Sequence, residues 1–145
     1  MRLLLVEDEL ELAAAIADWL QEDYEVVSVC NGESALACLR SGHFDLIILD
    51  WMLPGMSGLD VCRQYRNENG TAFVLMMTAK KYTSVKEQSL GAGANDFLSK
   101  PFSLRELSAR VKVLLQNERA VDCTSSCNSS KIIAVNSFSN NALCS

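Results

Sequence analysis

The sequence predicts an α/β fold in which helices pack on a parallel β-sheet. Three runs that are apolar apart from Arg2, residues 2–6, 46–49 and 72–77, have the length and composition of strands buried on both faces, which is typical of parallel sheets. Segments with helical spacing of apolar residues separate them, so strand and helix alternate five times along the chain. This alternation predicts a doubly wound, layered architecture with right-handed crossovers.

The other elements follow from local patterns. Strands are expected over the Val-rich segment 24–30 and over 96–99, and a helix is expected over 10–20, where apolar residues recur on one stripe. The remaining helices are predicted from their N-terminal caps: Asn31 before 33–40, Ser57 before 58–66, and S-x-x-E capping boxes at 84–87 and 103–106.

Composition narrows the class of protein. The chain has 145 residues, of which 49% are hydrophobic, and this suits one domain with a short appendage. The net charge of -5 argues against a polyanion-binding surface. The sequence contains no apolar run long enough for a membrane span, and its N-terminus does not resemble a signal peptide. We therefore expect a cytoplasmic protein that does not associate with membranes.

The composition changes after Gln116. Residues 120–145 are rich in Ser and Asn and carry only two charged residues, Asp122 and Lys131. We expect a domain over 1–117 and a linker or tail over 118–145. Short apolar segments at 131–135 and 141–145 leave two alternatives open: a flexible tail, or the truncated start of a second domain.

Polar residues stand at the carboxyl ends of four predicted strands: Glu7 and Asp8, Asp50, Thr78, and Lys100. In a parallel sheet these ends converge on one edge, where ligands bind. Three carboxylates repel one another, so each would have a raised pKa or need a cation, and oxygen ligands suit Mg²⁺. A lysine and a hydroxyl nearby suit the charge that develops on a phosphoryl group. Taken singly, each residue also fits a capping, turn or surface role, but their coincidence favours a phosphoryl-transfer site.

Four segments carry a family resemblance: "LLLVEDE", "DLIILDWMLPGMSG", "MMTAK" and "GANDFLSKPFS". Together they resemble the signatures of CheY-like receiver domains of bacterial two-component response regulators, over residues 1–117. The resemblance implies a flavodoxin-like, doubly wound (β/α)5 fold with strand order 2-1-3-4-5. It also implies a signalling phosphoacceptor that receives its phosphoryl group from a sensor histidine kinase. Beyond its own phosphorylation and dephosphorylation, such a domain is not an enzyme.

The resemblance also assigns roles around the acidic cluster. Asp50 is the implied phosphoacceptor. Glu7, Asp8 and Asp50 are the implied Mg²⁺ ligands, and the backbone carbonyl of Met52 completes the set. In that position Asp50 can attack a phosphorus atom in line, because a buried strand holds it at an open edge of the sheet, and the turn at Pro54, Gly55 and Gly58 leaves the approach free.

The remaining roles belong to residues of the fourth and fifth strands. Lys100 contacts the phosphoryl group, and Thr78 hydrogen-bonds to it after transfer. Phe97 occupies the position of an aromatic switch and lacks the hydroxyl that a tyrosine would bring. The Lys100–Pro101 peptide bond is implied to be cis.

The face built by the fourth helix, fifth strand and fifth helix resembles the symmetric dimer face of OmpR-type regulators, which carry a winged-helix DNA-binding domain. The residues concerned are Lys86, Leu90, Asp96, Glu106, Arg110, Val111 and Lys112. The implied pairs across a two-fold axis are Lys86 with Glu106 and Asp96 with Arg110. We expect a homodimer after phosphorylation, and DNA contact only through an output domain that is incomplete in this chain. Asn95 stands where an acidic residue is common, which leaves Lys112 short of a partner. An ordinary solvated face is the alternative.

Two other classes use similar features. A haloacid dehalogenase-type phosphotransferase also places an aspartate at a strand end, but it needs a second acid two residues later, where this chain has Met52. A flavodoxin-like FMN protein needs a phosphate-binding loop after the first strand, and the acidic "VEDE" would repel a phosphate there.

Overall fold

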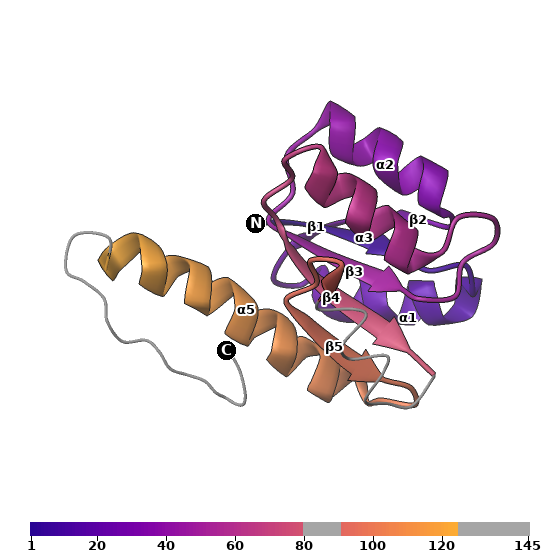
Figure 1. Cartoon of the computed structure of the whole chain (residues 1–145). Coiled ribbons are helices and arrows are strands. Elements are labelled where there is room, and N and C mark those ends of the chain that lie inside the picture. The colour runs from indigo at the N-terminus through magenta and orange to yellow at the C-terminus, as the bar shows by residue number, and fades with distance from the viewer. Residues whose placement is uncertain (80–90, 125–145) are drawn as a thin grey trace. The chain divides into compact units, whose positions relative to one another are not determined.

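The computed structural model describes residues 1–79 and 91–124 (Figure 1). The elements are β1 (Arg2–Val6), α1 (Leu10–Leu20), β2 (Glu25–Val29), α2 (Gly32–Ser41), β3 (Leu46–Asp50), α3 (Gly58–Asn67), β4 (Phe73–Thr78), β5 (Asp96–Ser99) and α5 (Leu104–Thr124). All strand pairs are parallel, and the order in the sheet is β2-β1-β3-β4-β5. The predicted fold class and strand order are confirmed.

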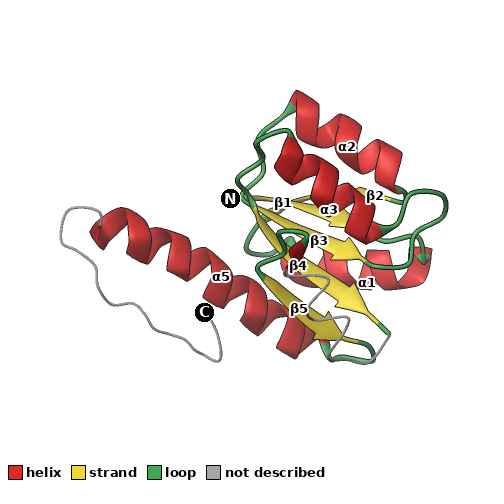
Figure 2. Ribbon diagram, in the orientation of Figure 1, coloured by secondary structure: helices red, strands yellow, loops and turns green. Residues whose placement is uncertain are grey.

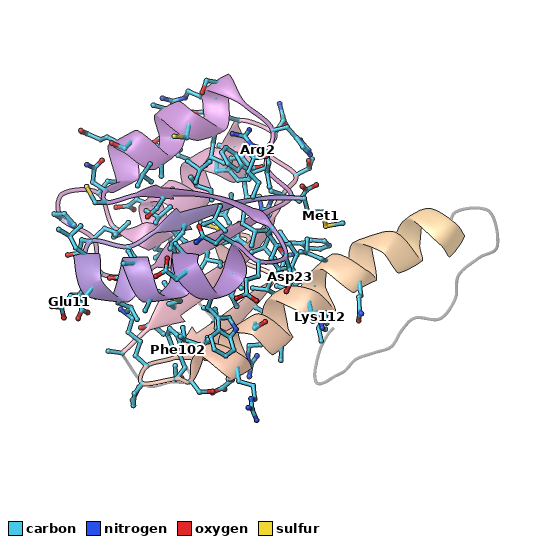
Figure 3. All side chains as sticks on the ribbon, turned by 180° about the vertical axis from the view of Figure 1, so that it is seen from behind. Met1, Arg2, Glu11, Asp23, Phe102 and Lys112 are labelled. Carbon is cyan, nitrogen blue, oxygen red and sulfur yellow. The ribbon has the colours of Figure 1, made fainter. Side chains whose placement is uncertain are left out.

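The sheet is buried on both faces. Leu4, Ile47 and Val74 lie side by side on β1, β3 and β4 and face a core that includes Leu36 of α2 and Val61 of α3. The alternate strand residues point to the opposite face, which α1 covers with its buried residues Ala13, Ile16 and Leu20 (Figures 2 and 3). Since β3 is buried along its whole length, its apolar run leads directly to Asp50.

Three of the predicted caps are present. The Asn31 side chain accepts from the backbone N–H of Ser34 at 2.7 Å, and Ser57 accepts from Asp60 at 3.2 Å. Ser103 accepts from Glu106 at 3.0 Å. The fourth predicted cap, in 84–87, lies outside the described residues. These bonds satisfy backbone N–H groups of the first turn, which have no acceptor within the helix, and they fix where α2, α3 and α5 begin.

The chain divides into two compact units, Met1–Val111 and Lys112–Ser145. Helix α5 begins in the first unit and continues to Thr124, beyond residue 117, where we expected the domain to end. The segments 131–135 and 141–145 lie outside the described residues. In the described ranges, no helix combines the length and apolar character needed to cross a membrane.

Arg66, near the end of α3, hydrogen-bonds to segments at the amino-terminal edge of the sheet. Its guanidinium donates to the carbonyl oxygens of Gly93 and Gly70 at 2.9 and 3.0 Å, and to the Asn95 side chain at 2.9 Å. The same Asn95 oxygen accepts from the backbone N–H of Val74 at 2.8 Å. Arg66 therefore connects α3, the turn before β4 and the turn before β5.

Candidate functional site

The residues at or just after the ends of four strands converge at the carboxyl edge of the sheet. Glu7 comes directly after β1, and its N–H donates to the carbonyl of Val29 at the end of β2. Asp50 ends β3 beside Met77 of β4, and Thr78 ends β4 beside β5. The backbone N–H of Lys100 donates to the Thr78 carbonyl at 2.7 Å. Parallel pairing therefore brings the expected site residues together.

The three carboxylates form one cluster. Glu7, Asp8 and Asp50 each offer an oxygen, and these oxygens lie within 4.8 Å of one another. Glu7 and Asp50 are buried, with 1% and 3% of their surface exposed, while Asp8 is exposed. Three oxygen donors at this spacing, with one open to solvent, fit a hard divalent cation that keeps some of its water, as Mg²⁺ does.

Lys100 lies against the cluster. Its Nζ is 3.3 Å from Glu7 Oε1 and 3.4 Å from Asp50 Oδ2. The Lys100–Pro101 peptide bond is cis, as expected. The ammonium group is thus within reach of any group that approaches the Asp50 carboxylate, and it offsets part of the negative charge of the pair.

The site perturbs two ionisation equilibria. Burial, reinforced by the nearby charge of Asp50, raises the pKa of Glu7 from 4.5 to about 7, although the N–H of Glu9 and the charge of Lys100 oppose the shift. Burial alone would lower the pKa of Lys100, but the charges of Asp50 and Glu7 outweigh it and raise that pKa. Lys100 is therefore a cation at neutral pH, whereas Glu7 titrates there.

The exposure of Asp50 differs from our expectation. From the sequence we expected an exposed carboxylate at an open edge of the sheet, but Asp50 is almost fully buried. Its Oδ1 accepts from the N–H of Met52 at 3.3 Å, and Oδ2 faces Lys100. These contacts hold the carboxylate in one orientation, because both of its oxygens have a donor. A ligand role for the Met52 carbonyl remains a prediction.

The two expected switch residues differ in burial. Thr78 is fully buried at the end of β4. Phe97 is half-buried on β5 and packs against the core on the α2 and α3 side of the sheet. Their positions suit a structural change that starts at Asp50 and reaches β5. Their roles in such a switch remain predictions.

An apolar groove of about 340 Å³ adjoins Lys100 and is lined by Leu12, Ala79, Lys100, Pro101 and Phe102. Phe102 lies beside α1 in Figure 3. A larger hollow of about 620 Å³ lies between residues 39–44 and 65–71. That hollow precedes β3 and β4, at the edge of the sheet opposite the carboxylates, and takes no part in the site.

The expected dimer face is only partly described. Asp96 and Arg110 form an ion pair of 2.9 Å within one chain, whereas we expected them to pair between two chains. Glu106 is exposed, but Val111 is fully buried, so its assignment to the dimer face is wrong. Lys86 and Leu90 lie outside the described residues, and Lys112 belongs to the second unit.

One feature beside the phosphoacceptor candidate could hardly be predicted from the sequence. Gly55 has φ +74°, so it forms the turn that we assigned to both glycines, but Gly58 is the first residue of α3 and lies against the backbone of Asp50. The available signal was a glycine eight positions after Asp50, and that spacing does not by itself reveal a packing contact.

Fold and site together define a CheY-like α/β signalling domain. The chain belongs to the response regulator receiver domain family, whose model matches residues 3–112. This membership decides against the dehalogenase-type and flavin-binding alternatives.

Curated relatives agree with this assignment. The chain is 41% identical over 116 residues to the transcriptional regulatory protein CiaR of Streptococcus pneumoniae, covering 80% of this chain and 52% of CiaR. It is 44% identical over 114 residues to the sensory transduction protein RegX3 of Mycolicibacterium smegmatis, covering 78% and 50%. The chain thus spans about half the length of the curated relatives it matches.

Solved structures share the fold. A Francisella response regulator receiver domain matches with a TM-score of 0.77 and 29% identity, covering 81% of this chain and 98% of that one. The response regulator TrrA of Thermotoga maritima, in complex with Mg²⁺ and beryllofluoride, matches with a TM-score of 0.70 and 37% identity, covering 78% and 97%.

Proposed function

We propose that Asp50 accepts a phosphoryl group from the phosphohistidine of a sensor histidine kinase. One observation carries the proposal: a buried, oriented carboxylate lies in an acidic cluster with Lys100 Nζ 3.4 Å from its oxygen. A paired structural aspartate would not need two further carboxylates within 4.8 Å. That arrangement is costly in the absence of a cation and suits a site that binds one.

In the proposed reaction, a carboxylate oxygen of Asp50 attacks phosphorus in line with the bond that breaks. The phosphorus–nitrogen bond of the donor cleaves, its electron pair stays on the imidazole nitrogen, and an acyl phosphate forms on Asp50. Lys100 offsets the negative charge of the incoming phosphoryl oxygens. Glu7, Asp8 and Asp50 would hold Mg²⁺, which supplies neutralising charge when bound. The buried Thr78 hydroxyl is the proposed donor to the phosphoryl group after transfer.

Two comparisons support this assignment. The TrrA structure contains Mg²⁺ and beryllofluoride, and the DrrB receiver domain was solved in a form described as beryllofluoride-activated, with a TM-score of 0.73 and 29% identity to this chain. Self-phosphorylation from small phosphodonors and self-dephosphorylation are part of the same proposal.

The output is also a proposal. Several relatives are named as transcriptional regulators, so we infer a regulator of the OmpR type, with a receiver over 1–117 followed by a linker to a DNA-binding domain. Phosphorylation would draw Thr78 inward, let Phe97 turn, and alter the face that carries Asp96, favouring a homodimer. A cytoplasmic location accords with this role and stays a prediction.

Acetyl phosphate with Mg²⁺ tests the proposal. The intact mass should rise by one phosphoryl group, and chelating the metal should prevent the gain. Asp50→Asn should gain nothing, whereas Asp60→Asn, which changes an exposed acid in the first turn of α3, should gain as much as the wild type. Equal labelling of Asp50→Asn and wild type would reject Asp50 as the acceptor.

A further inference from the structure

The amino-terminal end of α3 rests on the peptide unit of Asp50. A Cβ atom built on Gly58 would overlap the Asp50 carbonyl oxygen, and it would lie 2.9 Å from the Asp50 carbonyl carbon and 3.1 Å from Trp51 Cα. All three neighbours are backbone atoms, so no side-chain rotation could relieve the contact. Only glycine permits this approach without moving the chain.

The same contact closes the loop that orients the carboxylate. The N–H of Gly58 donates to the Trp51 carbonyl at 3.0 Å, so the loop 51–57 is joined at its base. Within that loop, the N–H of Met52 donates to Asp50 Oδ1. On the other side, the N–H of Trp51 donates to the Met77 carbonyl of β4 at 2.8 Å, which fixes the opposite edge of the same peptide segment.

We propose that Gly58 is a positioning residue for phosphoryl transfer. The absence of a side chain at 58 lets α3 press the Asp50–Met52 backbone against β4, and this holds the Asp50 carboxylate within reach of Glu7, Asp8 and Lys100. Any larger residue displaces that backbone, and with it the attacking oxygen. The inference rests on the proposed role of Asp50 as phosphoacceptor and adds a residue that does not itself touch the reacting atoms.

A crowded glycine at the opposite edge of the sheet provides a matched control. Gly70 precedes β4, and a Cβ there would overlap the ring of Tyr65. Alanine is crowded at either position, but only at 58 does it press on Asp50. Gly91→Ala is a control for the change from glycine to alanine alone, because a Cβ built on Gly91 would meet nothing within 4 Å.

The experiment compares Gly58→Ala, Gly70→Ala and Gly91→Ala. Urea unfolding gives the folded fraction, and all rates are expressed per folded molecule. We expect Gly58→Ala to slow phosphorylation of Asp50 by acetyl phosphate about tenfold to a hundredfold, because small displacements of a reacting atom are costly. Its Mg²⁺ affinity, followed by Trp51 fluorescence in a Trp19→Phe background, should fall too. Gly70→Ala should lose stability and yet keep its rate within about twofold of wild type, since Gly70 lies before β4, at the edge of the sheet opposite the carboxylates. Gly91→Ala should keep the wild-type rate.

Two results would overturn the inference: a Gly58→Ala protein that is phosphorylated at the wild-type rate, or equal slowing by Gly70→Ala. If Gly58→Ala does not fold, Ser57→Ala decides instead, because it loosens the first turn of α3 by removing one capping bond and adds no atoms. Its phosphorylation should slow several-fold, and an unchanged rate would count against the inference. A wild-type chain that takes up no phosphoryl group at Asp50 would instead refute the proposed function, and this inference with it.

Discussion

Glu7 is a buried acid whose charge state depends on whether a cation is present. Its pKa is raised from 4.5 to about 7, mainly by burial. In the metal-free protein, the folded state therefore binds a proton at Glu7 that the unfolded state has already released between those pH values. The stability that this group contributes is fully present below pH 4.5 and is lost as the pH rises through about 7.

We expect the free energy of unfolding, measured by urea in the presence of a chelator, to fall between pH 5 and pH 8 by up to about 3 kcal/mol on account of Glu7. Glu7→Gln should flatten this dependence, because an amide does not titrate. The exposed Glu22 serves as the control, and Glu22→Gln should keep the wild-type slope. Identical slopes for Glu7→Gln and wild type would show that Glu7 is not the titrating group.

Asp8 is the solvent-exposed member of the acidic cluster. Asp8→Ala should lower the affinity for Mg²⁺ at least about tenfold, because two remaining carboxylates hold a hard divalent ion poorly. Since the chain has two tryptophans, a Trp19→Phe background leaves Trp51, next to Asp50, as the reporter of binding. Glu11→Ala removes a nearby exposed acid and should titrate like wild type. If Mg²⁺ changes the fluorescence of both variants at the same concentration, the metal site lies elsewhere.

At the scale of the elements, capping fixes where the helices begin. The Asn31 side chain accepts from the N–H of Ser34 at 2.7 Å, so Asn31→Ala should destabilise the protein by about 1 kcal/mol in urea unfolding. Asn31→Asp retains an acceptor oxygen and should lose much less. Phosphorylation per folded molecule should be unchanged in both variants, because the cap of α2 lies outside the acidic cluster. Equal stabilities for Asn31→Ala and Asn31→Asp would mean that this bond contributes nothing.

Much of this level of structure could be predicted from the sequence because it depends on local patterns. Unbroken apolar runs indicated the strands, and Asn31 and Ser57 indicated two helix starts. The five site residues Glu7, Asp8, Asp50, Thr78 and Lys100 could be grouped because parallel strands share a carboxyl edge.

The rest depends on contacts between segments far apart in the sequence. The burial of Asp50 and the raised pKa of Glu7 arise from neighbours on other strands, and the charge of Lys100 opposes the shift at Glu7. The hydrogen bond from Arg66 to Asn95 joins residues 29 positions apart. From the sequence, Asn95 was considered only because it stands where an acidic partner of Lys112 is common. No periodicity or motif encodes such distances, so these features required the structure.

At the scale of the whole molecule, we expect a phosphorylation-dependent dimer. Asp96 already pairs with Arg110 within the chain, so pairing between chains must exchange one partly exposed ion pair for another. Each such pair is worth on the order of 0.2–1 kcal/mol, and we therefore expect single charge reversals to weaken the dimer only modestly. Arg110→Asp should do so, and adding Asp96→Arg should restore part of the loss by re-forming the pair with its signs exchanged.

Sedimentation of the beryllofluoride-bound protein measures this effect. Arg105→Asp, which reverses an exposed charge at the start of α5, provides a comparison outside the proposed pairs. A protein that stays monomeric at high micromolar concentration would rule out the OmpR-type dimer, as would a double variant no better than Arg110→Asp. Either result would leave the receiver family assignment intact, because that assignment does not depend on the dimer face.

The most direct test of the central claim is to locate the phosphoryl group. Borohydride reduces an aspartyl phosphate to homoserine, which peptide mass spectrometry can place in the sequence. After treatment with acetyl phosphate and Mg²⁺, we expect homoserine at position 50, dependent on Mg²⁺ and absent from Asp50→Asn. Homoserine at position 8, or its absence from a wild-type protein shown to be folded, would contradict the account.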